Sequence, residues 1–402
     1  MKTYLPQLIA LLFLANCSSD KDTASQPTQV VPVDDILTPA NVRTYMVDAA
    51  ATAEATALFY NLKKNSAVNT AIGQQDAFGS FYGAEGDSDM KKTTGHDPAL
   101  LGSDFMFITD ADNNGQPNNW FFQQEQKIIS DARQAYSKGM INTFCWHLRE
   151  PNHEVSFYAA DMTDEEKQTA FVGILPGGIH HDWFKAKLDK VAQVLNDLKD
   201  SDGVSIPVIF RPFHEFDGNW FWWGKDYCSD AQYKEAYQFV VTYLRDVKGV
   251  HNVLYAFSPD NSYTSETAYL TRYPGDDFVD VLGMDNYGDM NGTQSGILNA
   301  AAKLEYLSAL AYQKVKIAAL TETGYRVTNT IPPVDGWFTD YLYAAMNEHD
   351  IQLAYVMFWN NSADGYYVPI PSSPNASDFI SFSIKPGMQL VNNLPELYQF
   401  TQ

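Results

Sequence analysis

The sequence is poor in positive charge. Its 402 residues include 27 Lys and Arg against 49 Asp and Glu, which gives a formal net charge of −22. A protein that binds nucleic acid needs a basic stripe to neutralise phosphates, and an anionic lipid surface attracts the same kind of cluster. The charge balance therefore argues against both partners and suits a soluble protein with a neutral ligand.

Cysteine and histidine are also scarce. The chain has three Cys and 8 His, and their spacing matches no zinc site. Cys145 lies in an apolar segment and is expected to be a small buried side chain. An exported protein could join it to Cys228, but nothing in the sequence indicates that disulfide. A phosphate loop is missing too, because the residues at 73–76, GQQD, fit neither the dinucleotide nor the P-loop pattern. We therefore expect no metal and no cofactor.

The apolar run at the N-terminus, from Leu5 to Ala15, is too short to span a bilayer. It follows the basic Lys2 and ends at Asn16 and Cys17, and small residues before a cysteine resemble a bacterial lipoprotein signal. We therefore expect residues 1–16 to be a signal peptide and Cys17 to be lipidated. The alternative is an ordinary signal peptide in which this cysteine has no special role.

Residues 17–37 are mostly polar and predict a flexible tether behind the lipidated cysteine. The protein would then be exported and held by its lipid in the bacterial cell envelope, at the outer membrane. The sequence does not decide between the periplasmic and the cell-surface side of that membrane.

The rest of the chain is rich enough in apolar residues, 45% overall, to form a full core, which excludes a disordered protein. Eight short apolar segments show little polar alternation, as strands buried on both faces do. Because helical segments separate them, we expect an α/β protein, a closed (β/α)8 TIM barrel in one domain over residues 38–402, rather than an open doubly wound sheet. The predicted strands are 70–74, 105–109, 140–146, 206–210, 253–257, 279–284, 317–320 and 353–358.

Helical periodicity marks the connecting segments. The clearest apolar stripes lie in 121–138, 183–200 and 230–248. Thr38 is a good N-cap and Pro39 suits the next position, so a first helix is predicted from residue 41 to about residue 64. Weaker patterns predict helices at 300–314, 336–349 and 386–394, and long loops at 152–182 and 361–377.

Polar side chains gather just past the C-terminal ends of these strands, where barrel enzymes build their active sites. Glu215 ends the fourth strand, beside Arg211 and His214, and a glycine-broken loop with three Trp follows. Glu322 ends the seventh strand, nearly opposite the fourth in an eight-stranded barrel. Two carboxyl groups about 5–5.5 Å apart are what a retaining glycosidase uses. The pair therefore predicts a glycosidase, and aromatic residues, 14% of the chain, suit either a large core or rings that stack on sugars.

These segments resemble glycoside hydrolase family 26. The sequence RPFHEFDGNWFWWG at 211–224 is similar to the acid/base segment of that family, and LTETG at 320–324 is similar to its nucleophile segment. The first of these is highly specific, whereas the second alone would be weak. The likeness extends from about residue 40 to the end of the chain. Further matches are GHDPALLGSD at 95–104, Trp146-His147 followed by Glu150-Pro151, and MDNY at 284–287.

The resemblance implies a role for each matched residue. Glu215 is similar to the general acid/base of the family and Glu322 to its nucleophile. His214 resembles the residue that hydrogen-bonds the substrate beside the acid/base. Tyr287 resembles the hydroxyl group that orients the nucleophile.

Other matched residues are expected to bind the substrate. His147 resembles the histidine that holds the sugar at the cleavage site, and Trp220 and Trp359 resemble the aromatic walls around the scissile bond. Asp104 closes another matched segment and is expected to take part in binding. Arg211 points to the same side as Glu215 by strand alternation. It could keep a catalytic carboxylate ionised, or it could form an ordinary buried ion pair.

Two features of the central segment leave open questions. Trp222 and Trp223 could contact the substrate or could only pack inside the loop. After the acid/base glutamate, family members commonly have Met or a similar residue and then Asn, whereas this chain has Phe216 and Asp217. That difference could alter a neighbouring subsite or a loop contact but leaves the two glutamates in place.

The implied activity is a retaining endo-β-1,4-mannanase, a monomer that cleaves β-mannan, galactomannan or glucomannan and meets the membrane only through its lipid. One alternative is a β-glucanase or β-1,3-xylanase of the same family, which would use the same pair of glutamates. A non-catalytic glycan-binding lipoprotein is another, but it would leave that pair without a role. Endo or exo preference and the tolerance of galactose branches are not decided by the sequence.

Overall fold

The computed structural model describes residues 36–79, 87–348 and 350–400. The predicted signal peptide, the predicted lipidation site Cys17 and nearly all of the predicted tether lie outside these residues. Across the described part of the chain, no helix is both long enough and apolar enough to cross a membrane.

Eight parallel strands form a closed barrel. Each strand pairs with the next along the chain, and the first strand pairs with both the second and the eighth, which closes the sheet. This confirms the predicted (β/α)8 fold. All residues of these strands except Thr70 are buried, because helices cover the outside of the barrel and side chains fill its interior. The strands are β1 (Thr70–Gln75), β2 (Leu100–Asp104), β3 (Ile141–Cys145), β4 (Val208–Arg211), β5 (Val253–Phe257), β6 (Val281–Asn286), β7 (Ile317–Thr323) and β8 (Tyr355–Phe358).

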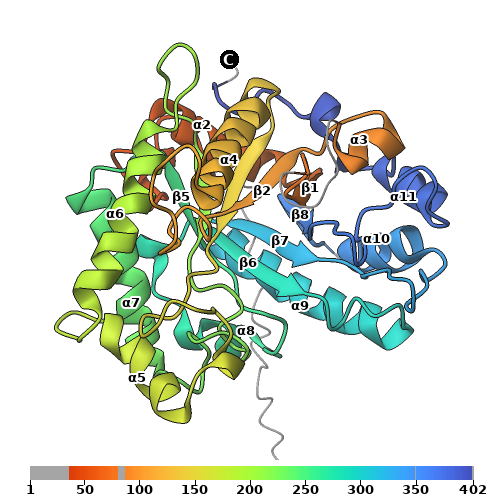
Figure 1. Cartoon of the computed structure of the whole chain (residues 1–402). Coiled ribbons are helices and arrows are strands. Elements are labelled where there is room, and N and C mark those ends of the chain that lie inside the picture. The colour runs from red at the N-terminus through yellow and green to blue at the C-terminus, as the bar shows by residue number, and fades with distance from the viewer. Residues whose placement is uncertain (1–35, 80–86, 349, 401–402) are drawn as a thin grey trace, which may run out of the picture. The chain divides into compact units, whose positions relative to one another are not determined.

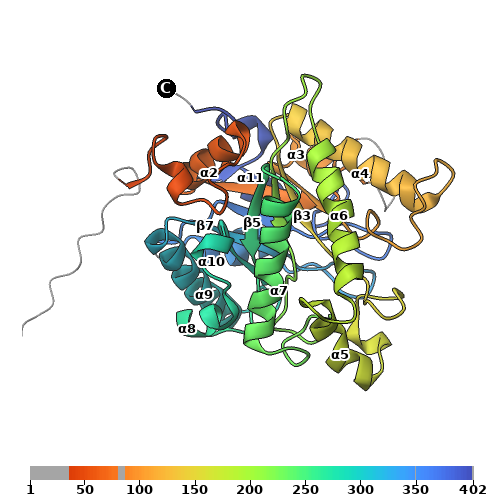
Figure 2. The same ribbon diagram turned by 90° about the vertical axis from the view of Figure 1, so that its left-hand side faces the viewer.

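The helices surround these strands (Figure 1). The stripe predicted from Phe184 to Leu198 is buried against the barrel, and its helix lies beside α7 in both views (Figures 1 and 2). Ser229 and Gln232 form a capping box that starts α7. The helices are α2 (Ala53–Asn65), α3 (Asp89–Thr94), α4 (Trp120–Ser137), α5 (Asp164–Ile174), α6 (His181–Asp197), α7 (Asp230–Thr242), α8 (Glu266–Tyr269), α9 (Gln294–Gln313), α10 (Tyr343–Met346) and α11 (Ala376–Ser383), with π-helical turns at Tyr243–Val247 and Trp337–Leu342.

The second strand lies earlier than predicted, at Leu100–Asp104 instead of 105–109. The chain turns directly after Asp104, because its carboxylate accepts a hydrogen bond from the backbone N–H of Met106 at 2.8 Å. The apolar run that suggested a strand is this turn, and its residue Phe105 is fully buried. Asp104 therefore ends a strand and lies at the C-terminal face of the barrel.

The first helix is shorter than predicted. It begins at Ala53, with Thr52 as its N-cap, and only a short 3-10 turn, Val42–Thr44, precedes it. The backbone between them is held by a distant group, since the N–H of Val47 donates to the carboxylate of Asp280 at 2.8 Å. This hydrogen bond takes the place of the one that the N–H would donate to a backbone carbonyl in an α-helix.

The C-terminal segment also differs from the prediction. Residues 386–394 contain no α-helix but a two-residue strand, β9 (Met388–Gln389), which pairs with the start of β1, and a 3-10 turn, Val391–Asn393. The unpredicted helix α11 begins inside the segment 361–377 that was expected to be a loop, and α5 lies inside the other, 152–182.

Candidate active site

Three carboxylates meet at the C-terminal end of the barrel. Glu215 follows β4, Asp285 lies in β6 and Glu322 lies in β7. Oxygen atoms of the three side chains all lie within 4.8 Å of one another. This separation is close to the roughly 5–5.5 Å between the carboxyl groups of retaining glycosidases. The two predicted glutamates therefore face each other across the barrel mouth.

Arg211, the last residue of β4, supplies the positive charge of this cluster. Its Nη1 donates to the two oxygens of Asp285 at 2.7 and 3.0 Å, and its Nη2 forms an ion pair with Oε1 of Glu322. The side chain is fully buried. Burial opposes its charge, but the two carboxylates raise the pKa of Arg211 well above its ordinary value, so it stays protonated. Arg211 thus pairs with a carboxylate of the candidate site and also forms a fully buried ion pair with Asp285.

The second oxygen of Glu322 is held by Tyr287. The phenolic hydroxyl donates to Oε2 at 3.1 Å. Burial, and then the charge of Glu322, raise the pKa of Tyr287 well above its usual value, so the hydroxyl keeps its proton and remains a donor. Both oxygens of Glu322 therefore receive hydrogen bonds from fixed groups, an arrangement that suits an ionised carboxylate.

Glu215 has the opposite surroundings. Burial, and then the negative charges of Glu322, Asp285 and Asp260, raise its pKa well above the ordinary value. The indole N–H of Trp220 donates to Oε2 of Glu215 at 2.8 Å and acts against that rise. The net result is a carboxyl group that can hold a proton near neutral pH. One glutamate is thus suited to donate a proton and the other to act as an anion.

Two histidines lie side by side next to this pair. Nδ1 of His147 lies 2.6 Å from Oδ2 of Asp104, and Nε2 of His147 lies 3.2 Å from Nε2 of His214. Burial, and then the neighbouring His147 and Arg211, lower the pKa of His214 well below its usual value, so this ring is neutral. The two Nε2 atoms share one hydrogen bond, in which one ring donates and the other accepts.

The aromatic residues of the site divide into two groups. Trp220 is 40% exposed at the rim, and the ring of Trp359 stands edge-on to His147, with centroids 5.8 Å apart. Trp222 and Trp223 are fully buried. Their indole N–H groups donate to the carbonyls of Leu148 and His214, each at 2.7 Å. Trp222 and Trp223 therefore pack inside the loop and hold its backbone.

A sequence model of glycosyl hydrolase family 26 matches residues 47–370. The chain belongs to this family. Among curated proteins it is 36% identical over 355 residues to a mannan endo-1,4-beta-mannosidase of Bifidobacterium adolescentis, a match that covers 84% of this chain and 34% of that protein. It is 27% identical over 233 residues to a mannan endo-1,4-beta-mannosidase of Bacillus subtilis, covering 56% and 60%. The chain thus spans about a third to three fifths of these relatives.

Solved structures of family 26 proteins superpose on the chain. GH26C from a Muricauda species has a TM-score of 0.89 and 51% identity, over 90% of this chain and 98% of that one. An endo-beta-1,4-mannanase of Cellulomonas fimi has a TM-score of 0.81 and 33% identity, over 89% and 80%. A beta-mannanase of Bacteroides ovatus has a TM-score of 0.76 and 33% identity, over 87% and 98%.

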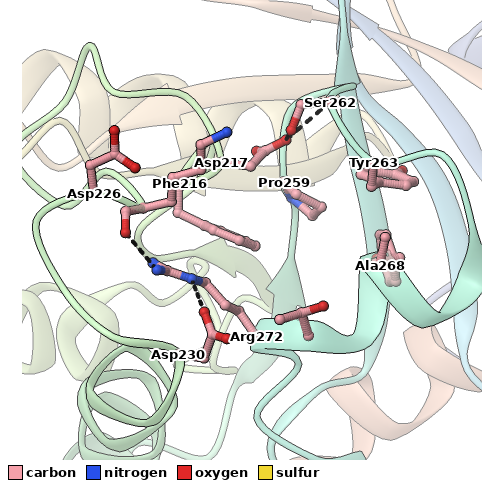
Figure 3. Close-up of a pocket in the computed structure, with 12 residues that line it drawn as sticks. Phe216, Asp217, Asp226, Asp230, Pro259, Ser262, Tyr263, Ala268 and Arg272 are labelled. Carbon is pink, nitrogen blue, oxygen red and sulfur yellow. Dashed lines mark hydrogen bonds and ion pairs between the residues drawn. The ribbon is translucent and has the colours of Figure 1, made fainter.

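The residues that depart from the family pattern, Phe216 and Asp217, attach the Glu215 loop to the rest of the barrel (Figure 3). Asp217 accepts the N–H of Asp260 at 2.6 Å and hydrogen bonds from the backbone and hydroxyl of Ser262. The ring of Phe216 is buried, with the guanidinium of Arg272 5.8 Å from its centroid. A cavity of about 360 Å³ lies behind this loop, and neither catalytic candidate lines it. The departure therefore serves loop support.

Asp285 is the residue of the site to which sequence reasoning assigned no role. The only signal was its place in the matched segment at 284–287. Besides Arg211, it binds the hydroxyl of Thr321 at 2.5 Å. The three carboxylates could offer oxygens to a cation, but the guanidinium of Arg211 already supplies the positive charge between them.

The two cysteines of the described residues, Cys145 and Cys228, are free and buried, so no disulfide joins them.

Proposed function

We propose that this protein is a retaining endo-β-1,4-mannanase that hydrolyses β-mannan, galactomannan or glucomannan. One observation carries the proposal: a carboxylate oxygen of Glu215 and one of Glu322 lie within 4.8 Å of each other, with burial raising the pKa of Glu215 and with Arg211 and Tyr287 bound to the oxygens of Glu322. The names of the family 26 relatives, mannan endo-1,4-beta-mannosidases, support the choice of substrate. No metal or cofactor takes part in the proposed reaction.

In the first step, Glu322 attacks the anomeric carbon of a mannosyl unit. Glu215 gives its proton to the glycosidic oxygen while the carbon–oxygen bond breaks, and the leaving sugar chain departs with that proton. The ion pair with Arg211 and the hydroxyl of Tyr287 hold the two oxygens of the attacking carboxylate in place. The product is a covalent glycosyl–enzyme ester.

In the second step, the charge of Glu322 is gone because the carboxylate is esterified. One cause of the raised pKa of Glu215 disappears with it, and Glu215 becomes a base. It takes a proton from a water molecule whose oxygen attacks the anomeric carbon and releases the ester. Two inversions at this carbon give overall retention.

The neighbouring residues would hold the sugar during these steps. His147 and His214, with Asp104 behind them, would form the floor under the sugar at the cleavage site. Trp220 and Trp359 offer aromatic faces to the sugar rings on either side of the scissile bond.

Proton NMR of mannohexaose during digestion tests the proposal. We expect the β-anomer of the new reducing end to appear first, and a mixture of short products to show an endo pattern. The variants Glu322→Ala and Glu215→Ala should lose this activity, while the exposed Glu235→Ala, on α7, should keep it. The proposal is wrong if the α-anomer appears first or if Glu322→Ala turns over at a near-normal rate.

The same assay on lichenan, β-1,3-xylan, galactomannan and glucomannan separates the mannanase from the glucanase and xylanase alternatives. A protein that binds these glycans without cleaving any of them would be a binding lipoprotein instead. We expect preferential cleavage of the mannans, by a monomer in size-exclusion chromatography.

We also propose that the protein is exported and anchored in the cell envelope through lipid on Cys17. The support is the residue pattern that ends at this cysteine. Cells that express the full chain in radioactive palmitate should label it, and Cys17→Ala should abolish the label. Unlabelled wild-type protein in the medium would indicate an ordinary signal peptide.

A further inference from the structure

Tyr367, in the segment after β8, packs on the backbone that follows Glu322. Its ring lies against Gly324, whose φ is +152°. A Cβ atom at this position would overlap Cδ1 of Tyr367 and lie 3.2 Å from Cε1 and Cγ. Only glycine leaves room for the ring to come this close. The close approach places a phenol beside the candidate nucleophile that no sequence pattern had indicated.

The ring of Tyr367 also adjoins that of Tyr287. Their centroids lie 6.0 Å apart at an angle of 62°. Tyr287 is the residue that donates to Glu322 at 3.1 Å, so the two phenols stand next to each other on the nucleophile side of the site. Within the described residues, the hydroxyl of Tyr367 has no hydrogen-bond partner, and the residue is half-buried, so a ligand could reach it. It is free to bind a ligand.

The charges around Tyr367 support this placement. Burial raises its pKa, Glu322 and Glu215 add to the rise, and Arg326 acts against it. The hydroxyl is therefore protonated at neutral pH and lies in the field of both glutamates. A neutral phenol of this kind can donate a hydrogen bond to a sugar hydroxyl and offer its ring to a sugar face.

The segment that carries Tyr367 is held in place. The side-chain oxygen of Asn361 accepts the N–H groups of Tyr367 and Val368 at 2.9 and 3.1 Å. Tyr366 forms a two-bond backbone bridge with Val327, at 2.9 and 3.0 Å, which joins the segments after β7 and β8. The ring is thus pre-positioned, so binding would not have to order it.

We propose that Tyr367 is a further substrate-contacting residue. Its ring packs against the sugar bound beside Glu322, and its hydroxyl donates a hydrogen bond to that sugar chain. The inference rests on the proposed glycosidase function and adds a specificity contact to it. Gly324 is the positioning residue that lets this ring reach the site.

A matched pair of variants tests the contact. Tyr367→Phe removes the free hydroxyl, whereas Tyr366→Phe removes the neighbouring hydroxyl, which donates to the side chain of Asn375 at 2.9 Å instead. We expect Tyr367→Phe to lower kcat/KM for mannohexaose about 3- to 10-fold, the value of one neutral hydrogen bond. Tyr366→Phe should retain wild-type kinetics, and thermal unfolding should show both variants folded.

Calorimetry of mannohexaose binding in a Glu215→Gln background gives a readout that a structural role would not move. Adding Tyr367→Phe should weaken binding, and adding Tyr366→Phe should not. The inference is overturned if the two tyrosine variants behave alike, whether both match the wild type or both lose activity equally. Failure of the wild-type protein to cleave any mannan would instead overturn the proposed function.

A double-mutant cycle tests the part assigned to Gly324. Gly324→Ala strains the backbone in any background, but its methyl group meets the ring only when Tyr367 is present. We therefore expect the fold loss of activity caused by Gly324→Ala to be at least about threefold smaller in a Tyr367→Ala background than in the wild type. Equal losses in both backgrounds would show that Gly324 serves its own backbone and not the ring.

Discussion

The two candidate catalytic glutamates are carried by unlike pieces of backbone. Glu322 is part of a strand, β7, close to a shift in its register with β6 and β8. Arg211, at the end of β4, holds one of its oxygens, and Tyr287, after the neighbouring strand β6, holds the other. Glu215 lies in the loop after β4, where Phe213 and Glu215 both have left-handed φ angles of +52°. Such angles are strained for residues other than glycine.

The loop after β4 is kept in this conformation by contacts along its length. The N–H of Glu215 donates to the carbonyl of Ser258 at 2.9 Å, the hydroxyl of Tyr233 donates to the carbonyl of Phe213 at 3.0 Å, and Trp223 donates to His214. The nucleophile candidate thus depends on an ion pair and the acid/base candidate on loop support. This difference teaches that two kinds of scaffold give the same type of side chain two different surroundings.

The largest expected effect is the loss of activity when either glutamate is removed, and the step that is lost should differ between the two. Glu215→Ala should slow hydrolysis of mannan by about 10²–10⁴-fold, the usual contribution of a general acid. On an aryl mannoside with a good leaving group, the same variant should still form the glycosyl–enzyme, whereas Glu322→Ala should not. Burst kinetics and mass spectrometry of the trapped intermediate measure this. A burst from Glu322→Ala would exchange the assigned roles.

The next effect concerns the ion pair. Arg211→Met leaves Asp285 and Glu322 buried without their cation, and removal of one partner of a buried pair costs about 3–5 kcal/mol. Urea denaturation should show that loss of unfolding free energy, together with loss of activity. The exposed pair of Lys185 with Asp182 gives a control, since Lys185→Met should leave the denaturation midpoint almost unchanged. Equal midpoints for the two variants would contradict the dependence on Arg211.

A smaller effect is expected from the loop support. Trp223→Phe preserves most of the buried ring but leaves the carbonyl of His214 without its donor, which costs about 1–3 kcal/mol. Urea denaturation should report this loss, and kcat should fall more than KM rises, because the loop carries Glu215. Trp183→Phe is the control, since its indole N–H binds the half-exposed Glu154 outside the loop. A larger loss of kcat in the control would contradict the prediction.

The smallest effects are opposite shifts of the pH profile. Activity falls on the alkaline side as Glu215 loses its proton. Trp220→Phe removes a hydrogen bond that lowers the pKa of Glu215, so this limb should move to higher pH. Asp260→Asn removes a negative charge that raises the pKa of Glu215, so the alkaline limb should move to lower pH. The pKa of Asp260 is itself raised to about 7, by burial and then by Asp217, so its effect should appear only above that pH.

Profiles of kcat/KM between pH 5 and 9 should resolve the direction of each shift. Asp202→Asn, in the turn before β4 at the other end of the barrel, is the control and should shift nothing. Shifts of the same sign in Trp220→Phe and Asp260→Asn would contradict the assignment of the alkaline limb to Glu215.

The sequence was sufficient for the barrel and for its two glutamates. The strand Val253–Phe257 was predicted with its observed bounds. Glu215 and Glu322 were predicted to face each other across the barrel mouth, where their oxygens meet, although Glu215 lies in the loop after β4 and not at the strand end. Both results depend on local patterns, namely apolar segments of strand length and a distinctive motif. Neighbouring residues determine such patterns, so no knowledge of distant contacts was needed.

Only the tertiary structure decided the remaining features, because each depends on partners far apart in the chain. Val47 leaves the predicted helix for the carboxylate of Asp280, 233 residues away. The turn at Asp104 sets the end of β2 and brings this residue to His147. The residues after that turn, FMFIT at 105–109, are more apolar than LLGSD at 100–104, so the apolar pattern alone favoured the wrong segment.

The charge state of the site has the same origin. Arg211 on β4 was predicted to point to the same side as Glu215. Its partners, Asp285 and Glu322, come from β6 and β7, and closure of the barrel brings them together. Tyr367 reaches Gly324 in the same way. Local sequence thus determined most of the strand segments and the motifs that carry the two glutamates. Barrel closure decided which of them meet, since electrostatic and packing partners are chosen by distance in space and not by distance along the chain.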